Sequence, residues 1–194
     1  AVAFYDALAA QADQTEASRR DRGEALFRLT GAHWQLGRMD AARQAYDQAM
    51  AQFKQLAAEF PANPAYRRGA AVNATQVAEL LIDNRAPNDA TPYLAEAAEA
   101  FDQLLEQHPT DPDYAARRAY VASLAGERLR QLGQMESVPT EFARAITILE
   151  SVDLSTATPE QSIDVRFRLA RALNQLAVFE LEVLWKFAQA GERV

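Results

Sequence analysis

The side chains best suited to acid–base chemistry lie in pairs along predicted helices. Glu79 with Asp83 and Glu96 with Glu99 are four and three residues apart, a spacing that brings two carboxylates to one side of a helix. Such a pair works as acid and base only where its surroundings shift a carboxyl pKa. Arginine and lysine residues are scattered nearby, so we expect these carboxylates on a solvated helix face without a catalytic role.

Two histidines are the candidates for imidazole chemistry, and the sequence contains 0 cysteines, which excludes disulfides and thiolate metal sites. His33 has no second histidine within helical reach, so we expect it to pack or to hydrogen-bond. His108 lies at a predicted helix end, where a capping role explains it. Motifs for phosphate loops, nucleophilic serines and HExxH zinc sites are missing. We therefore expect no metal, no cofactor and no enzyme activity.

The overall charge argues against a nucleic-acid partner. The 194 residues carry a formal net charge of -7, whereas nucleic-acid binding needs a basic surface. No apolar stretch approaches the roughly 20 residues of a membrane span, so we expect a soluble chain suited to cytoplasm or periplasm. Residues 2–8 already read as helix, which indicates a segment of a larger protein.

A repeat of 48 residues is the strongest pattern in the sequence. Landmark residues of one copy recur 48 positions later: Phe53, Leu56, Pro61, Pro64 and Tyr66 correspond to Phe101, Leu104, Pro109, Pro112 and Tyr114. The register extends back to Tyr5 and Leu8, and Leu36-Gly37 recurs as Leu132-Gly133 after two periods. A long period of this kind is typical of an array of stacked repeats.

Each period reads as two helices. Residues 24–36 place apolar side chains three and four positions apart, as one helix face requires. Gly37 ends this helix, because glycine accepts a left-handed conformation. Asp40 is predicted to cap the next helix, which continues to Phe60.

The sequence therefore predicts a single all-helical domain over residues 1–194, with about eight helices. Its predicted parts are a partial repeat at 1–20, repeats at about 21–63, 64–111 and 112–157, and a C-terminal helix at 158–194. Asp111 and Thr158 are predicted helix caps, each followed by a proline. Small residues recur where paired helices are expected to cross, at Ala49, Ala97 and Ala145.

Residues 29–49 resemble a tetratricopeptide repeat. Leu29, Gly37, Ala42, Tyr46 and Ala49 fall on landmark positions of that family. The resemblance implies a right-handed superhelical array of antiparallel helix pairs, although the second helix is longer than usual and stretches the common period of about 34 residues to 48. Arrays of this long-period type are similar to those C-terminal to the kinase domain in some bacterial serine/threonine kinases. That similarity implies an interaction or regulatory module of a larger signalling protein.

In such arrays the first helix of each pair lines a concave groove. The resemblance places these residues in the groove: Arg28, Trp34 and Gln35, then Gln76, Glu79 and Asp83, then Glu127, Arg130 and Gln131. Family members that clamp a C-terminal carboxylate use lysines and asparagines, which do not occur at these positions. Trp34 fits either an interface anchor or a core position.

The predicted C-terminal helix is apolar on more than one face, which a terminal helix facing water should avoid. Leu181, Leu184 and Trp185 are candidates for self-association. A homodimer contact, a following repeat or a fold-back onto the last helix pair would each cover them.

Three functions stay open. The first is a scaffold that binds a peptide or partner domain through the groove. The second is a sensory domain that binds a small molecule and is coupled to an attached enzyme. A deep pocket with convergent polar groups would favour it. The third is a homodimerisation module that uses the C-terminal helix.

Overall fold

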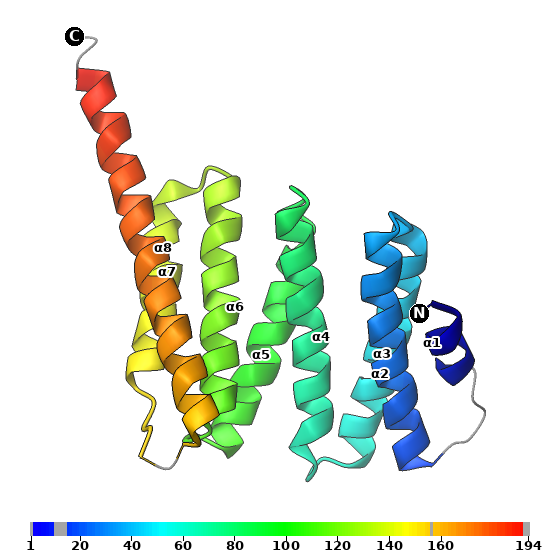
Figure 1. The fold of residues 1–194 in the computed structure, drawn as a ribbon. Helices are drawn as coiled ribbons and strands as arrows, with labels where there is room; N and C mark the ends of the chain where they lie inside the picture. Colours follow the sequence, from blue (N-terminus) through cyan, green and yellow to red (C-terminus); the bar gives the residue numbers. More distant parts are fainter. Residues whose placement is uncertain (1, 10–14, 156, 192–194) are drawn as a thin grey trace. The chain divides into compact units, whose positions relative to one another are not determined.

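A computed structural model describes residues 2–9, 15–155 and 157–191 (Figure 1). The helices are α1 (Val2–Ala9), α2 (Glu16–Gln35), α3 (Met39–Glu59), α4 (Pro64–Asp83), α5 (Thr91–Gln107), α6 (Pro112–Gln131), α7 (Val138–Glu150) and α8 (Pro159–Gly191). A short 3-10 helix, η1 (Met135–Ser137), leads into α7. The described residues contain no strand, and the predicted all-α class is confirmed.

The chain forms two compact units, and the boundary between them falls inside α4. Unit 1 is Ala1–Ala74 and unit 2 is Thr75–Val194. The predicted arrangement of residues 1–194 as one domain of consecutive repeats stays a prediction.

The turn between the two helices of a pair recurs with the 48-residue period of the sequence. Positive φ angles of 70°, 61° and 73° occur at Gly37, Arg85 and Gly133. Each next residue donates a backbone hydrogen bond to the carbonyl five positions earlier: Arg38 to His33 (2.9 Å), Ala86 to Leu81 (2.9 Å) and Gln134 to Leu129 (3.0 Å). This pattern ends a helix and is favoured by glycine. Arg85 holds the same conformation with a side chain in place.

The turn after the second helix recurs as well. Asn63 and Asp111, one period apart, accept backbone hydrogen bonds from Ala65 at 3.1 Å and Asp113 at 2.9 Å. Equivalent rings pair beside these turns: Phe60 with Tyr66 at 6.1 Å between centroids, and His108 with Tyr114 at 5.9 Å. His108 is the C-cap residue of α5, as predicted.

Two predicted caps are confirmed and one is wrong. Asp111 caps α6, and Thr158 forms a reciprocal capping box with Gln161, whose backbone N–H donates to Thr158 Oγ1 at 3.2 Å. The Thr158 N–H in turn donates to Gln161 Oε1 at 2.9 Å. Asp40 does not cap α3, because that helix already begins at Met39. The Asp40 carboxylate lies in the first turn of α3, where a negative charge interacts favourably with the helix dipole.

The core of unit 1 joins its first three helices. Leu26 and Leu29 of α2 pack against Ala45 and Ala49 of α3, and α1 adds Val2 and other partly buried side chains. Arg19 of α2 also forms a two-pronged ion pair with Glu59 of α3, with N to O distances of 2.5 and 2.9 Å. The apolar core and the Arg19–Glu59 ion pair therefore hold α2 against α3.

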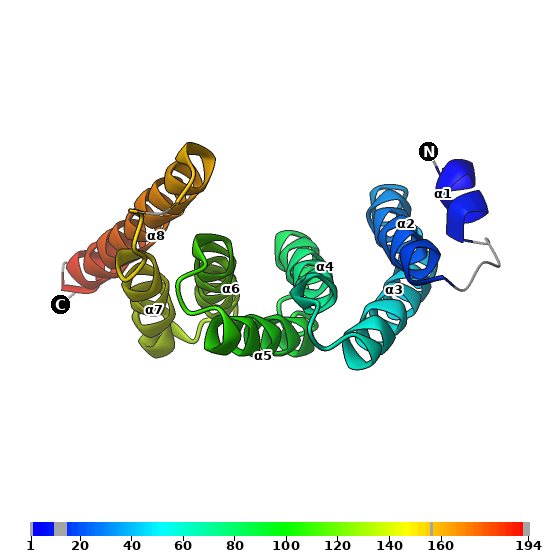
Figure 2. The ribbon, with the colours of Figure 1, turned by 90° about the horizontal axis from the view of Figure 1, so that it is seen from below.

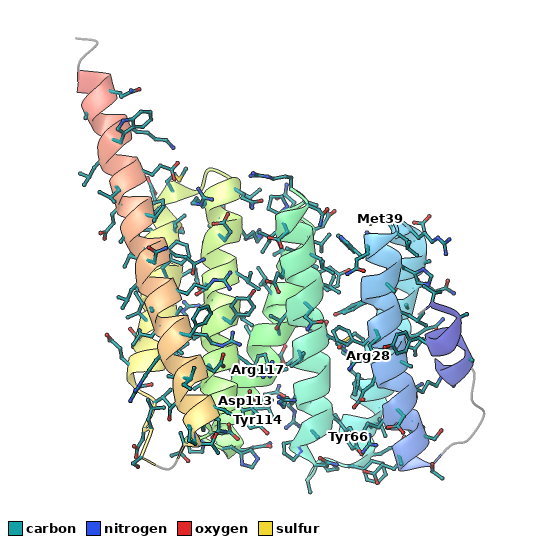
Figure 3. The ribbon with its side chains drawn as sticks, in the orientation of Figure 1. Arg28, Met39, Tyr66, Asp113, Tyr114 and Arg117 are labelled. Atoms are coloured by element: carbon teal, nitrogen blue, oxygen red, sulfur yellow. The ribbon has the colours of Figure 1, made fainter. Side chains whose placement is uncertain are left out.

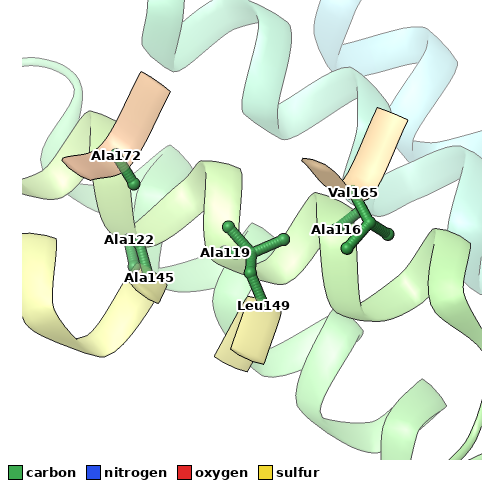
Figure 4. Packing of buried hydrophobic residues seen from close by; sticks show 7 residues of the cluster. All are labelled: Ala116, Ala119, Ala122, Ala145, Leu149, Val165 and Ala172. Atoms are coloured by element: carbon green, nitrogen blue, oxygen red, sulfur yellow. The ribbon is translucent and has the colours of Figure 1, made fainter. Parts of the chain in front are cut away.

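Unit 2 packs α6 against α7 and α8 through small side chains. Figure 4 shows the cluster formed by Ala116, Ala119, Ala122, Ala145, Leu149, Val165 and Ala172. Because most of these residues are alanines, the three helix backbones approach closely. Figure 2 shows α8 lying along α7 at the edge of this unit.

Candidate functional site

A pocket of about 370 Å³ lies in unit 1 between α2 and the first half of α4. We call it the arginine pocket. Its lining includes Arg20, Glu24, Phe27 and Arg28 from α2, Phe53 from α3, and Ala65, Tyr66, Arg68, Gly69, Val72 and Asn73 from α4. Arg28 and Tyr66 are labelled in Figure 3. The lining thus combines guanidinium groups with aromatic and aliphatic surface.

Phe53 forms an apolar part of the pocket wall because two glycines leave room for its ring. A Cβ on Gly69 would lie 2.8 Å from Phe53 Cε1, and a Cβ on Gly23 would lie 3.2 Å from the same ring. Distances below 3.0 Å require something to move. Gly126 accommodates Phe142 in the same way in unit 2, with a distance of 2.7 Å. The pocket therefore depends on a glycine in the first turns of α4.

Positive charge dominates the pocket lining. Three arginines face one acidic residue, Glu24, although the whole chain carries a net charge of -7. Arg20 donates to Asp21 Oδ1 at 2.7 and 3.0 Å, and this hydrogen bond raises the pKa of Arg20. Arg28 is exposed and has no hydrogen-bond or ion-pair partner among the described residues. A guanidinium in this setting can bind an anion.

Asn73 places a side-chain hydrogen-bond donor in the pocket wall. The residue is 2% exposed, and its side-chain Nδ2 has no hydrogen-bond partner within the described part of the chain. A buried donor without a partner is rare in folded proteins, because its desolvation is not compensated. An acceptor on a bound molecule would supply the missing hydrogen bond.

Tyr66 borders the same pocket, but its hydroxyl already has a hydrogen-bond partner. It donates to Glu16 of α2, and this hydrogen bond, with burial second, raises the pKa of Tyr66. Tyr66 thus stays neutral and ties α4 to α2. Its ring contributes apolar surface to the pocket.

Unit 2 contains a polar network whose charged side chains have partners. Tyr120 of α6 donates its hydroxyl to Glu79, and the Arg168 and Arg171 guanidinium carbons lie 5.1 and 5.2 Å from the Tyr120 ring centroid. Burial, together with the bond to Glu79, strongly raises the pKa of Tyr120. Cations at this distance over an aromatic face are attracted to it.

A second part of the polar network joins α6 to α8. Arg130 donates to both oxygens of Glu127 at 2.9 Å and to Glu182 at 3.3 Å. Gln131 Nε2 adds a hydrogen bond to Glu127 at 3.2 Å. Burial alone would raise the pKa of Glu127, but the hydrogen bonds from Arg130 and Gln131 lower it below its usual value. These side chains hold unit 2 together.

The groove residues predicted from the sequence therefore have different surroundings. Arg28 borders the arginine pocket, whereas Glu79, Glu127, Arg130 and Gln131 belong to the polar network. Gln35, Gln76 and Asp83 are exposed. Trp34 is half-buried, and its indole Nε1 is buried with no partner in the described residues.

Sequence reasoning missed three of the pocket residues, Arg20, Arg68 and Asn73. Arg20 and Arg68 are 48 residues apart, so they are equivalent in the repeat. That spacing is the signal that would have found them. Asn73 gives no signal of its own, because its burial depends on how α4 packs.

The candidate self-association residues lie on an uncovered face of α8. Leu181, Leu184 and Trp185 are 66%, 65% and 61% exposed. Phe179, on the opposite face, is 4% exposed and packs with Val138 and Phe142. The helix thus has one apolar face in the core and one in solvent.

No protein-family model matches the sequence, and no curated protein matches it. Among the described residues, no group of three or more histidine, aspartate or glutamate side chains is placed to hold a metal ion. None of the described helices is long and apolar enough to cross a lipid bilayer. The pocket geometry is therefore the main basis for a functional assignment.

Proposed function

We propose that this chain is a protein-interaction module that holds an acidic segment of a partner protein in the arginine pocket, and that it is not an enzyme. The observation that carries the proposal is the combination, in one pocket, of the exposed Arg28 with the buried amide of Asn73, neither of which has a hydrogen-bond partner among the described residues. Both groups donate hydrogen bonds. A carboxylate accepts them, and a charge-assisted hydrogen bond is roughly twice as strong as a neutral one.

The apolar part of the pocket favours a peptide with an aromatic or aliphatic residue beside its acidic residues. Phe27, Phe53 and Val72 supply this surface. A volume of about 370 Å³ accommodates one large side chain and a neighbouring carboxylate. A small organic anion carries the same charge as an acidic peptide, so the pocket also fits the alternative function of a sensory domain. Competition experiments distinguish the two kinds of ligand.

Turns that recur at Gly37, Arg85 and Gly133 support an array of helix pairs with a 48-residue period. We propose that this array is a tetratricopeptide-like, right-handed solenoid and that it serves a larger bacterial signalling protein. Binding of a partner segment is the role such a module would have there.

The test uses fluorescein-labelled ten-residue peptides and fluorescence anisotropy. One peptide carries four glutamates around a central phenylalanine, and a second carries lysines in their place. We expect the acidic peptide to bind and the lysine peptide not to bind. The variant Arg28→Ala should weaken binding about tenfold, since a hydrogen bond to a charged group is worth about 1.5 kcal/mol and 1.4 kcal/mol corresponds to a factor of ten.

The matched control is Arg43→Ala, because Arg43 is an exposed arginine of α3 outside the pocket. It should bind the acidic peptide as the unaltered chain does. Equal losses in both variants would show that binding depends on general charge, and the pocket assignment would be wrong. If citrate or phosphate alone displaces the peptide at micromolar concentration, the small-molecule function is favoured instead.

A further inference from the structure

Helix α8 presents two apolar faces on opposite sides. One face, which includes Val165, Ala172 and Phe179, packs against α6 and α7. The other face carries seven large apolar side chains that are each 47% to 68% exposed: Ile163, Phe167, Leu173, Val178, Leu181, Leu184 and Trp185. In Figures 1 and 2, α8 lies at the edge of unit 2.

The exposed residues form a continuous stripe. With the exposed Ala170 and Asn174 included, the central positions of the stripe are three or four residues apart, so they stay on one side of the helix: Ile163, Phe167, Ala170, Asn174, Val178, Leu181 and Trp185, with Leu173 and Leu184 beside them. At 1.5 Å per residue the stripe is about 33 Å long. Exposed apolar surface of this extent is typical of an interaction site.

The stripe is symmetric about Asn174, which is exposed at its centre. Ile163 and Trp185 lie 11 residues on either side of it, and Phe167 and Leu181 lie 7 residues on either side. Two antiparallel copies related by a two-fold axis bring together residues at equal distances from the centre. Large side chains would therefore meet large ones at both ends, and the smaller Ala170 would meet Val178 near the middle.

The charged residues beside the stripe also favour an antiparallel pair of α8 helices. Arg166 and Glu180 flank the stripe on the same side, 8 residues before and 6 residues after Asn174. In an antiparallel pair, Arg166 of one copy lies within about one turn of Glu180 of the second copy. Neither residue has a hydrogen-bond or ion-pair partner among the described residues. A parallel pair would instead place each end of the stripe beside its own equivalent.

We propose that two copies of this chain associate through antiparallel α8 helices, with the two-fold axis passing at Asn174. The two Asn174 side chains then face each other and exchange amide hydrogen bonds. A single polar residue in an apolar helix interface fixes register and orientation in this way. The interface lies in unit 2 and is independent of the arginine pocket.

The test uses single cysteines, because the chain contains 0 cysteines of its own. Asn174→Cys should give a disulfide-linked dimer in near-complete yield under mild oxidation at micromolar concentration. Ile163→Cys alone should stay monomeric on a non-reducing gel. An equal mixture of Ile163→Cys and Trp185→Cys chains should form a mixed disulfide dimer.

Light scattering of the unaltered chain should show the mass rising from 21.5 kDa to twice that value with concentration. Phe167→Glu should abolish the rise, and because Phe167 is 66% exposed, its circular dichroism should stay that of the unaltered chain. Self-linking of Ile163→Cys would indicate a parallel pair and would overturn the proposal. A constant monomer mass, with no link through Asn174→Cys, would overturn it as well and would assign the face to a different partner.

Discussion

The arginine pocket of unit 1 and the polar network of unit 2 use similar side chains in opposite ways. In the network, Tyr120 bonds to Glu79, and Arg130 bonds to Glu127 and Glu182. In the pocket, Arg28 and the Asn73 amide are left without partners in the described residues. Paired polar groups stabilise a fold, whereas unpaired buried ones cost free energy. Under the proposed function, unit 2 uses the charged side chains of its network for stability, whereas unit 1 keeps Arg28 and Asn73 for a ligand.

The largest effect should come from removing the Tyr120 hydroxyl. Tyr120→Phe leaves the half-buried Glu79 carboxylate without its donor, and a hydrogen bond to a charged group contributes about 2 kcal/mol. We expect the free energy of unfolding of unit 2 to fall by about that amount in urea denaturation. Gln76→Ala, at an exposed position of the same unit, is the control and should change it by less than about 0.5 kcal/mol.

The same variant carries a pH prediction. An unfolded tyrosine ionises near pH 10, and the folded pKa of Tyr120 is raised well above its usual value by burial and by Glu79. The stability from the neutral hydroxyl is therefore complete below about pH 10 and is lost as the pH rises through the folded pKa. Tyr120→Phe should flatten this alkaline decline. An unchanged decline would assign it to other groups.

The opposite effect is expected in the arginine pocket. Asn73→Leu replaces a buried amide, which has no partner in the described part of the chain, with an apolar group of similar size, so the free energy of unfolding should rise by about 1 kcal/mol. Peptide binding should weaken at the same time. Thr30→Val is the control, because the buried Thr30 hydroxyl does have a partner, the Leu26 carbonyl at 3.1 Å. It should destabilise unit 1 by about 1 kcal/mol, and destabilisation by Asn73→Leu would remove the contrast between the two regions.

Arg85 gives a smaller effect that sharpens the comparison. Its positive φ of 61° costs about 1 kcal/mol relative to glycine, while its charge helps to lower the pKa of Glu127. Arg85→Gly should therefore raise the free energy of unfolding by up to about 1 kcal/mol. Thermal unfolding at low and high salt measures this change. The gain in stability should be larger at high salt, because salt already screens the attraction between Arg85 and Glu127 that the substitution removes. If Arg85→Gly lowers the free energy of unfolding at both salt concentrations, the backbone of Arg85 is not strained.

The smallest expected effect is the loss of the stabilising contribution of Glu127 at acid pH. Because the folded pKa of Glu127 lies below its usual value, its stabilising contribution is complete above about pH 4.3 and is lost as the pH falls through the folded pKa. Glu127→Gln should cost about 0.5 kcal/mol at pH 7 and almost nothing at pH 2. Urea denaturation at both pH values measures the difference. Equal costs at both would show that the charge of Glu127 does not matter.

Local features were predictable from the sequence, and the binding pocket was not. The left-handed turns at Gly37 and Gly133 and the cap at Asp111 depend on single residue types, so the sequence alone predicts them. Arg85 escaped notice because an arginine seldom adopts that conformation. The pocket depends on the approach of α2 and α4 around Phe53. That approach brings Arg20, Arg28 and Arg68 together, and no local pattern encodes it.

The most direct test of the central claim is an NMR titration of the ¹⁵N-labelled chain with the acidic peptide. The claim predicts that the side-chain amide of Asn73 and the backbone amide of Gly69 shift during the titration and that those of Asn84 and Glu127 stay in place. Saturable shifts confined to the unit 1 residues would establish the arginine pocket as the binding site. Shifts at Glu127 and Tyr120, with Asn73 unchanged, would contradict the account and move binding to the polar network.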